Sequence, residues 1–374
     1  MIIPRILQPQ IEANLFQGKI IVLYGARQVG KTTLIKQIAE HYPDSAYFNC
    51  DEPDVRTALT GKTSSEMVNF LGKANLIILD EAQRVENIGL ALKLLIDNHP
   101  ELQIIATGSS SFDLAGKISE PLTGRKIVYH LYPFSLQELR SEFSELELNR
   151  ILGIRMVYGM YPEIIIGKSD PGALLQEITN SYLYKDLFSF NEVKNPEVLW
   201  QLLRALALQV GNEVSYNELG ALVGLDKKTI MKYLQVLEAA FVIFRLPPYH
   251  NNPRKEIGQK RKVYFFDNGI RNALINNLNP INLRNDVGAL WENFMLAERI
   301  KKNSSSQQSN PMYFWRGVQQ GEVDYIEVAG GTISAFEMKW NKTAKAAPPA
   351  SFRALYPEVP YKVVHSENYW TFVG

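Results

Sequence analysis

The chain has 374 residues, which is more than a single hydrophobic core usually supports, so we expect two or three domains. Its 40 Lys and Arg residues against 39 Asp and Glu residues give a net charge of +1, which excludes a globally basic nucleic-acid-binding protein but leaves room for a local basic patch. Cys50 is the only cysteine, which excludes an intrachain disulfide and a cysteine-based zinc site.

The N-terminal end and the hydropathy of the chain favour a cytoplasmic protein. The first ten residues, MIIPRILQPQ, contain an early proline and no long apolar core, so they are not typical of a signal peptide. No apolar run approaches the length of a membrane-spanning helix, so we expect no membrane partner. A lone cysteine fits a reducing compartment.

Short apolar runs alternate with helical patterns over residues 1–135. The helical spacing of apolar residues is clear at Ile88–Asn98. This alternation predicts an α/β fold in which a parallel sheet is covered by helices on both faces. The expected strands are Lys19–Tyr24, Ala46–Asn49, Leu76–Leu79, Gln103–Ala106 and Lys126–Leu131.

The rest of the chain divides into three regions of different pattern. Residues 136–205 are mostly helical, 206–275 have a compact two-helix rhythm followed by two strands, and 280–374 combine one long amphipathic helix with short strands. The polar run NSSSQQSN and the segment NKTAKAAPPAS are expected to be loops. We therefore predict an α/β core over 1–135, a helical lid, and two smaller C-terminal domains.

The stretch GARQVGKT follows the first strand, opens a helix and has the spacing G-x-x-x-x-G-K-T. Backbone N–H groups at a helix N-terminus converge on an anion, and glycines let the backbone approach it closely. Lys31 is expected to reach the terminal phosphates, and the Thr32 hydroxyl to bind Mg²⁺. The pattern predicts a P-loop for ATP. The expected nucleotide contacts are Gly25, Ala26, Arg27, Gln28, Val29, Gly30, Lys31, Thr32 and Thr33.

The stretch LIILDEAQR places two acids at the end of a buried strand. The carboxyl ends of parallel strands meet at one edge of a sheet, so these acids are expected to face the P-loop. We expect Asp80 to hold Mg²⁺ through water and Glu81 to orient or deprotonate the attacking water. The acid pair therefore predicts hydrolysis of ATP in addition to binding.

Two further stretches give weaker indications. IIATGSSS ends a strand in small hydroxyl residues, and Thr107 or Ser109 is a candidate contact to the γ-phosphate or the water, although a plain Gly/Ser turn explains the spacing nearly as well. In LTGRK, Arg125 precedes the last strand of the core. An arginine beside a phosphate stabilises transition-state charge, in cis or from a neighbouring subunit.

Together, GARQVGKTTL, LIILDEAQR, IIATGSSS and LTGR resemble the AAA+ superfamily within the additional-strand P-loop ATPases. YPFSLQEL, GMYPEI, YLYKDL and YFFDNGIRNAL are also similar to a bacterial and archaeal group of predicted ATPases. The resemblance implies the roles given above to the P-loop and the acid pair, and a finger role for Arg125 in trans. It also implies a homo-oligomer, such as a hexameric ring. No second sensor arginine is found in residues 136–205, so coupling of hydrolysis to lid movement is not predicted.

The stretch VSYNELGALVGLDKKTIMKYLQVLEAAF has the rhythm of a helix-turn-helix. Gly224 is expected at the turn and Asp226 as the cap of the second helix, and the two strands that follow complete a winged-helix pattern. Six basic residues and one acid lie between Arg245 and Lys262. This clustering favours contact with DNA phosphates over a winged helix that binds only protein. The expected DNA contacts are Lys227, Lys228, Arg254, Lys255, Lys260, Arg261 and Lys262.

In EVDYIEVAGGTISAFEMKW, acids and a lysine fall in two successive strands. Alternate residues of a strand share a face, so Glu337 and Lys339 point the same way, and a hairpin brings Asp324 to them. Two carboxylates and a lysine can bind Mg²⁺ and activate a water for phosphodiester cleavage. Glu292, on the long helix, is a candidate further carboxylate.

This D…E-x-K pattern resembles the PD-(D/E)XK, restriction-endonuclease-like nuclease fold, which includes Holliday-junction resolvases. The resemblance implies that Asp324 and Glu337 are metal ligands. It also implies Lys339 as charge stabiliser or water activator and Glu292 as an accessory acid. Residue 323 is valine where that motif has proline. The alternative is a nuclease-like scaffold retained for binding, with Glu337 and Lys339 as an exposed ion pair.

The sequence as a whole predicts a cytoplasmic AAA+-type protein that binds and hydrolyses ATP with Mg²⁺. We expect it to act on DNA through a winged helix and a nuclease-like domain. The alternative is a signalling or regulatory NTPase whose C-terminal domains bind protein and have no nuclease activity.

Overall fold

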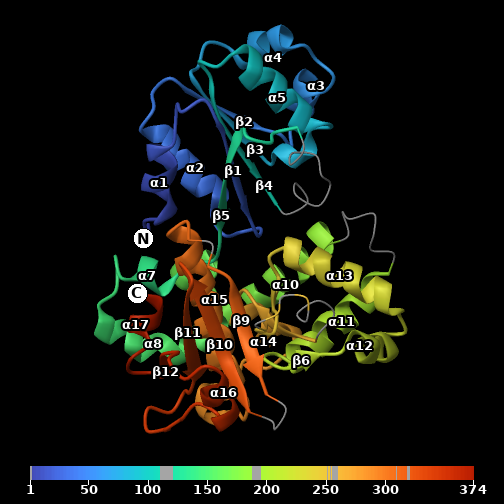
Figure 1. Ribbon diagram of the computed structural model, residues 1–374. Helices are drawn as coiled ribbons and strands as arrows, with labels where there is room; N and C mark the ends of the chain where they lie inside the picture. The colour runs from blue at the N-terminus through green and yellow to red at the C-terminus, as the bar shows by residue number, and fades with distance from the viewer. Residues whose placement is uncertain are drawn as a thin grey trace.

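The computed structural model describes residues 2–109, 121–187, 195–250, 252, 254, 260–308, 310–317 and 321–374, with the backbone alone for 181–187. The chain forms two lobes (Figure 1). One lobe holds the first five strands and the helices that flank them, and the other holds the elements that follow. The N-terminus lies near the junction of the two lobes, where it can contact both.

Five parallel strands form the first sheet, in the order β2-β3-β4-β1-β5. Strand β4 lies between β1, which ends in the P-loop, and β3, which ends in the acid pair. The predicted parallel sheet of a P-loop NTPase is therefore confirmed. The strands are β1 Ile20–Gly25, β2 Ser45–Asn49, β3 Leu76–Asp80, β4 Gln103–Gly108 and β5 Lys126–Leu131.

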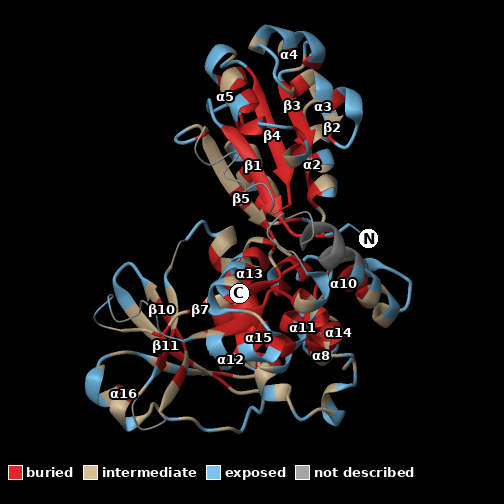
Figure 2. Cartoon of the chain, turned by 90° about the vertical axis from the view of Figure 1, so that its right-hand side faces the viewer, coloured by how far each residue is buried: buried red, intermediate tan, exposed pale blue. Residues whose placement is uncertain are grey.

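Helices cover both faces of this sheet, because its central strands are apolar on both sides (Figure 2). In β1, Ile21 and Leu23 point into a core shared with α1 and α2, whereas Ile20 and Val22 point into the core under α3, α4 and α5. A strand with two buried faces appears in the sequence as a continuous apolar run. The helices of this lobe are α1 Leu7–Ala13, α2 Lys31–Glu40, α3 Pro53–Leu59, α4 Ser64–Leu71 and α5 Ile88–Asn98, with the short η1 Ala82–Arg84.

The region after β5 is helical, as predicted for 136–205. Its helices are α7 Leu136–Leu139, α8 Glu145–Tyr158, α9 Pro162–Ile166, α10 Pro171–Leu187 and α11 Pro196–Leu208.

The next region contains the expected pair of helices and a small antiparallel sheet. Gly224 joins the helices with φ of 71°, and the Asp226 carboxylate caps the second one by accepting from the backbone N–H groups of Lys228 (2.8 Å) and Thr229 (3.0 Å). The strands follow the order β6-β8-β7. The elements are β6 Glu213–Val214, α12 Tyr216–Val223, α13 Lys227–Ala239, β7 Ile243–Leu246 and β8 Arg261–Phe265.

Two stretches noted in the sequence, GMYPEI and YFFDNGIRNAL, meet in the fold. The buried Asp267 carboxylate accepts from the backbone N–H groups of Met160 (2.7 Å) and Gly269 (2.8 Å), at the start of α14 Asn268–Leu274. A Cβ at Gly159 would lie 2.0 Å from the Asp267 carboxylate, so this position has no room for a side chain. Helix α14 packs against α8 and α10, so the two regions between 136 and 275 share one core.

The C-terminal region is a long helix followed by a four-stranded sheet in the order β12-β11-β10-β9. Strands β9, β10 and β11 are antiparallel neighbours, and β12 joins parallel to β11. Its elements are η3 Ile281–Leu283, α15 Val287–Ser305, β9 Met312–Arg316, β10 Glu322–Ala329, β11 Thr332–Met338, α16 Ala350–Leu355, β12 Tyr361–Val364 and α17 Trp370–Val373.

The expectation of a loop at NSSSQQSN is wrong for its first three residues. Helix α15 continues to Ser305, because Asn303 is buried and its amide donates to the Glu327 carboxylate (3.2 Å). This hydrogen bond gives a polar side chain a partner inside the protein, which the hydropathy pattern does not reveal.

The small antiparallel sheet and the C-terminal region are joined by backbone and amide contacts. Tyr249 donates its backbone N–H to the Phe314 carbonyl (2.6 Å) in β9. Asn293 of α15 accepts from the Phe265 N–H (2.7 Å) and donates to the Phe265 carbonyl (3.0 Å) in β8. These contacts hold β8 against α15, so that Lys262 of β8 lies next to Glu292 of α15.

Candidate functional site

The loop from Gly25 to Gly30 leads from β1 into helix α2. Gln28 and Gly30 both have positive φ values, 59° and 95°. Positive φ is unusual for a residue with a side chain, so Gln28 holds a strained backbone of the kind found at functional sites. The loop therefore has the curled shape that the glycine spacing predicts.

Gly25 is required by the neighbouring strand as well as by the loop. It pairs in parallel register with Leu131 of β5, and a Cβ at this position would lie 2.2 Å from the Leu131 carbonyl oxygen. Real Cβ atoms do not approach a backbone oxygen so closely, so any larger residue displaces the loop or the strand. The close packing of loop and strand is a constraint that the motif alone does not show.

Lys31 opens helix α2 with its side chain folded over the loop. It is 5% exposed, and its ammonium group donates to the carbonyl oxygens of Gly25 and Ala26, at 2.9 Å each. The positive charge thus lies at the loop itself, beside the helix N-terminus that favours an anion.

Thr32 and Asp80 meet beneath the loop. The Thr32 hydroxyl donates to Asp80 Oδ2 (2.8 Å), and the Thr107 hydroxyl donates to Oδ1 of the same carboxylate. Asp80 is 3% exposed, so its charge is held by these hydroxyls rather than by bulk water. The sequence prediction that β3 delivers this acid to the P-loop agrees with the geometry.

Tyr47 is a site residue that the sequence reasoning missed. Its hydroxyl, on β2, donates to Asp80 Oδ2 (2.7 Å). Burial and this hydrogen bond raise the pKa of Tyr47, so the hydroxyl keeps its proton and remains a donor. The parallel pairing of β2 with β3 places it there. The sequence pattern does not give the order of strands in a sheet, so it could not predict that Tyr47 lies beside Asp80.

Glu81 stands beside this carboxylate on a strained backbone, with φ of 54°. Its N–H donates to the Thr107 hydroxyl (3.1 Å), and its carboxylate accepts from the amide of Gln83. The same amide lies 3.3 Å from the Ser109 hydroxyl, so Gln83 links the two residues. Gln83 was not predicted, although it stands two positions after Glu81 in DEAQR. Residues 110–120, which follow Ser109, lie outside the described part of the chain.

The residues present fit ATP with Mg²⁺. Carboxylate and hydroxyl oxygens are the ligands that Mg²⁺ prefers, and those of Thr32 and Asp80 are close enough to share one ion directly or through water. The curled loop, the Lys31 ammonium and the helix N-terminus supply the positive potential that a polyphosphate needs.

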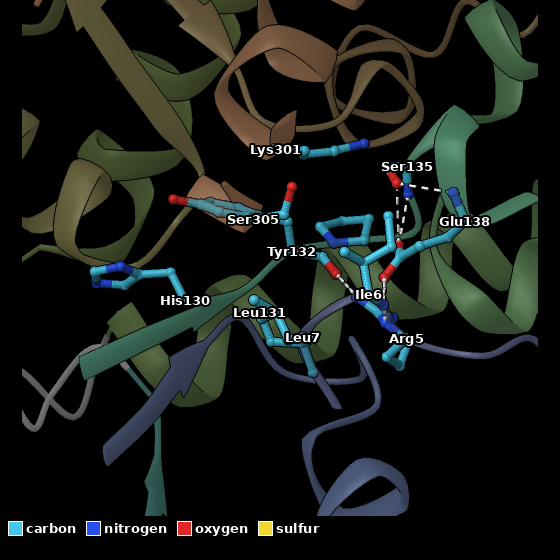
Figure 3. Close-up of a pocket in the computed structure, with 11 residues that line it drawn as sticks. Arg5, Ile6, Leu7, His130, Leu131, Tyr132, Ser135, Glu138, Lys301 and Ser305 are labelled. Carbon is cyan, nitrogen blue, oxygen red and sulfur yellow. Dashed lines mark hydrogen bonds and ion pairs between the residues drawn. The ribbon is translucent and has the colours of Figure 1, made fainter. Parts of the chain in front are cut away.

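Arg5 connects the P-loop to the second lobe. This side chain is 6% exposed; its Nη1 donates to the Val29 carbonyl (3.1 Å) and its Nη2 to the Tyr132 carbonyl (2.6 Å). Its Nε lies 3.0 Å from Glu138 Oε1, and Figure 3 shows the two groups pointing toward each other. The loop carbonyl, the end of β5 and helix α7 are therefore held by one guanidinium.

Arg125 lies at the opposite end of the sheet from the P-loop. Its backbone carbonyl accepts from Ile20 N–H at the start of the six-residue strand β1, whose last residue, Gly25, begins the loop, and its side chain pairs with Asp97 (2.6 Å). A strand of six residues spans about 20 Å, so the side chain does not reach the nucleotide of its own chain, and the role in cis is excluded. The role in trans stays a prediction.

Several of the expected DNA contacts gather in one groove on the second lobe. The groove has a volume of about 380 Å³ and lies between α13 and the β6–β8 edge. Lys227, Lys260 and Arg261 line it, and the first two are exposed. Lys228 and Arg254 are exposed outside it, and Lys255 lies outside the described residues.

Lys262 is not available to DNA, which corrects the sequence prediction. It is 2% exposed and points away from the groove, into carboxylates of the C-terminal region. Successive residues of a strand face opposite sides, so Arg261 meets solvent where Lys262 is buried. Counting basic residues along the chain does not distinguish the two.

The predicted acids of the C-terminal region come together around Lys262. Its ammonium lies 3.1 Å from Glu292 Oε1 and 4.0 Å from Asp324 Oδ1, and it also pairs with Glu322. The register of β10 and β11 places Glu337 next to Asp324. Lys339 pairs with Glu337 (2.7 Å) and is 40% exposed.

Burial and the neighbouring carboxylates change the titration of this cluster. Burial, followed by the charges of Glu292 and Glu337, raises the pKa of Asp324 well above its usual range, and Lys262 opposes the shift. In the described ranges, no group of three or more His, Cys, Asp or Glu side chains has the geometry to hold a metal ion. The predicted acids are therefore adjacent but do not form a ready metal site.

The sheet order and the loop geometry give the first lobe the fold of a P-loop NTPase. Residues 17–140 match the family model described as an AAA domain. Residues 150–280 and 287–370 match two further models, each described as a domain of unknown function.

Similar chains occur in bacteria and archaea. An uncharacterized protein of Mycobacterium tuberculosis, Rv2008c, is 28% identical over 340 residues, which cover 89% of this chain and 73% of that protein. An uncharacterized protein of Methanocaldococcus jannaschii, MJ1637, is 28% identical over 373 residues, which cover 87% of this chain and 76% of that protein. The similarity thus extends through the C-terminal regions.

Solved structures show distant likeness. The Walker-type ATPase PABY2304 of Pyrococcus abyssi aligns with 73% of this chain and 96% of its own, at 17% identity and a TM-score of 0.46. The ORC1 protein of Aeropyrum pernix in complex with DNA aligns with 73% of this chain and 89% of its own, at 12% identity and a TM-score of 0.28.

In the described part of the chain, no helix is long and apolar enough to cross a membrane.

Proposed function

We propose that the protein binds ATP with Mg²⁺ at the loop 25–32, hydrolyses it, and uses the resulting conformational change to act on DNA. The observation that carries the ATPase proposal is the contact between Thr32 and Asp80 beneath the loop, with Glu81 adjoining. The match of residues 17–140 to an AAA domain supports it.

Each residue of the site is assigned a separate role in phosphoryl transfer. Lys31 stabilises the terminal phosphates, and Thr32 with Asp80 would hold Mg²⁺, which supplies positive charge to the phosphate oxygens. Glu81 orients and deprotonates the attacking water. Gln83 and Thr107 hold Glu81 and Asp80 in place through the hydrogen bonds described above.

The test of this proposal is ATP turnover measured on three proteins. Wild type should hydrolyse ATP only with Mg²⁺. Lys31→Ala should lose nucleotide binding, whereas Glu81→Gln should bind ATP normally and lose at least about a hundredfold in turnover, since general-base catalysis contributes that much. An unchanged rate in Glu81→Gln would contradict the assignment of Glu81 as the general base. Normal ATP binding by Lys31→Ala would contradict the assignment of the loop as the nucleotide site.

The DNA proposal rests on the groove between α13 and the β6–β8 edge. The order α11, β6, α12, α13, β7, β8 supports the proposed winged helix, and Lys227 and Lys228 occupy the first turn of α13, which would be its second helix. Recognition helices make their contacts from this turn. The exposed cations of the groove are placed to meet phosphates.

The alternative is a regulatory NTPase whose second and third regions bind protein. ATP turnover measured with duplex, single-stranded and four-way-junction DNA separates the two functions. DNA that accelerates turnover supports the first, and turnover indifferent to every DNA at low salt supports the second.

We also propose that the C-terminal carboxylates form a divalent-cation site. Asp324 and Glu337 would be the ligands, Glu292 the accessory acid, and Lys339 the group that stabilises charge. Support comes from three contacts: Lys262 lies near both Glu292 and Asp324, the register of β10 and β11 puts Glu337 opposite Asp324, and Lys339 pairs with Glu337. Loss of Mg²⁺-dependent DNA cleavage in Asp324→Ala, with ATP turnover retained, tests this site.

The protein is proposed to work as a homo-oligomer in which Arg125 reaches the nucleotide of a neighbouring subunit. Its partial exposure and position far from its own P-loop support a role in trans. Arg125→Ala should lower turnover in the assembled protein while leaving ATP affinity unchanged. An unchanged rate, or a protein that stays monomeric with ATP, contradicts this role.

A further inference from the structure

The C-terminal carboxylate cluster contains a cation that comes from a different region of the chain. Lys262 belongs to β8, in the second region, and its ammonium lies among Glu292, Glu322 and Asp324, which belong to α15 and β10. Its side chain is 2% exposed, so these carboxylates replace nearly all of its hydration.

The position of Lys262 is fixed by the elements around it. Asn293, one residue after Glu292 on α15, holds the end of β8 through both of its hydrogen bonds to the Phe265 backbone. The Tyr264 hydroxyl, also from β8, donates to Glu292 Oε1 (2.5 Å), the same oxygen that Lys262 contacts. The ammonium is therefore directed into the cluster by its strand.

The charges of the cluster explain why a cation is needed there. Glu337 has its own partner in Lys339, and Glu322 pairs also with Arg316. The Lys262 ammonium lies within 4.0 Å of a carboxylate oxygen of both Glu292 and Asp324. Without it, these two largely buried carboxylates, each 14% exposed, would keep the neutral donors Tyr264 and the Met338 N–H and only the more distant charge of Lys339, which pairs with Glu337.

We infer that Lys262 is the resident cation of this cluster and that a divalent cation can bind Asp324 and Glu337, with Glu292 as accessory acid, only when Lys262 is removed from it. This inference rests on the cation site proposed above, and it assigns that site a closed state in which an internal lysine takes the place of the metal. The two occupants compete for the same carboxylate oxygens, because an ammonium and a metal ion cannot share them without strong repulsion.

The cluster and the basic groove use adjacent residues of the same strand, β8. Lys260 and Arg261 line the groove, and Lys262 is the next residue along the chain. Arg261 and Lys262 occupy opposite faces of β8.

The test is binding of Mn²⁺ alone to the full-length chain, measured by calorimetry without nucleotide. Lys262→Met should bind one Mn²⁺ at least about tenfold more tightly than wild type, a difference of about 1.4 kcal/mol. Lys232→Met, which removes an exposed lysine of α13, should bind like wild type. The gain should disappear in Lys262→Met combined with Asp324→Asn, which assigns the ion to the cluster rather than to the ATP site.

A second variant keeps the test valid if Lys262→Met does not fold. Lys262→Met combined with Glu322→Gln removes one cation and one anion, so the charge balance of the cluster is kept while Glu292, Asp324 and Glu337 remain. It should show the same gain in Mn²⁺ affinity, and Mn²⁺ should raise its melting temperature by mass action.

Two results overturn the inference, and they are distinguishable. If wild type binds Mn²⁺ as tightly as the lysine variants and loses it with Asp324→Asn, the cation site stands but Lys262 does not close it. If folded Lys262→Met and its Glu322→Gln companion bind no Mn²⁺, the cation site itself is wrong, and Lys262 is only a structural ion-pair partner.

Discussion

The Arg5 guanidinium donates to the Val29 carbonyl at 3.1 Å, although 24 residues separate the two, and thereby fixes the P-loop from outside. The same group lies 3.0 Å from the Glu138 carboxylate and 4.6 Å from the Phe134 ring. The Lys301 ammonium of α15 donates to the Phe134 carbonyl (2.9 Å). The phosphate loop is thus connected, through one arginine and a short segment after β5, to a helix of the C-terminal region.

Arg5→Lys should weaken binding of Mg-ATP by about 3- to 30-fold while the protein stays folded. Lysine keeps the charge beside Glu138, but it lacks the planar fork that serves two carbonyls and a carboxylate at once. Arg5→Ala is less informative, since it leaves a buried carboxylate unpaired at about 3–5 kcal/mol. The measurement is calorimetric affinity for a non-hydrolysable ATP analogue.

Arg353→Lys is the matched control for this change. Arg353 also donates to two backbone carbonyls, those of Pro357 and Val359, but in the C-terminal region. Its substitution should leave nucleotide affinity unchanged. If Arg5→Lys binds ATP as wild type does, the arginine is only a brace between lobes and does not position the loop.

Gly25→Ala should destabilise the first lobe by about 1–3 kcal/mol, in the range of overpacking substitutions, and should abolish nucleotide binding. The added methyl would lie 2.2 Å from the Leu131 carbonyl, so loop and strand must separate. Gly288→Ala is the control, because a Cβ there meets nothing within 4 Å in helix α15 and should change stability by less than about 0.5 kcal/mol. Urea denaturation of both variants, followed by ATP titration, checks the difference.

The first lobe was largely predictable because its signals are local. A strand, a glycine-rich turn and a helix in immediate succession leave few alternatives, and the predicted helix Ile88–Asn98 and strand Lys126–Leu131 have the bounds expected. Which residues from other strands complete the site was not predictable. Tyr47 reaches Asp80 only because β2 lies next to β3, and strand order depends on tertiary packing.

The second lobe shows the limit of charge counting. Six basic residues between 245 and 262 were treated as one patch. The fold separates them: Arg245 pairs with Glu238, Lys262 is buried among acids, and Lys260 is exposed. The alternation of side chains along β8 predicts that Arg261 and Lys262 face opposite sides. It does not predict which of the two is buried, because that depends on how α15 packs against the strand.

Lys227→Ala and Arg261→Ala should each weaken DNA binding to a similar extent for every sequence tested. Each removed phosphate contact makes the plot of log affinity against log salt shallower by about 0.9. Lys232→Ala is the matched control, since this lysine is exposed on the same helix α13 but does not line the groove. Fluorescence anisotropy at several salt concentrations measures the slopes. Equal slopes for all four proteins contradict the groove as the phosphate contact.

Glu327→Gln should lower the free energy of unfolding by about 3 kcal/mol at pH 7. Burial alone would raise the pKa of Glu327, but its hydrogen bonds with Arg299, both at 2.7 Å, and with Tyr325 outweigh burial and lower the pKa to about 2. A tenfold change in an acid dissociation constant corresponds to about 1.4 kcal/mol, and Arg299, which is 15% exposed, loses its charged partner in the variant.

The pH dependence separates this electrostatic role from packing. The carboxylate is easier to protonate in the unfolded chain, where its pKa is 4.5, than in the folded protein. Its contribution is therefore complete above pH 4.5 and is lost as the pH falls toward 2. The difference between wild type and Glu327→Gln in urea denaturation should shrink over this window, whereas exposed Glu358→Gln should match wild type throughout. A difference that stays constant from pH 7 to pH 3 would assign the loss to side-chain packing instead.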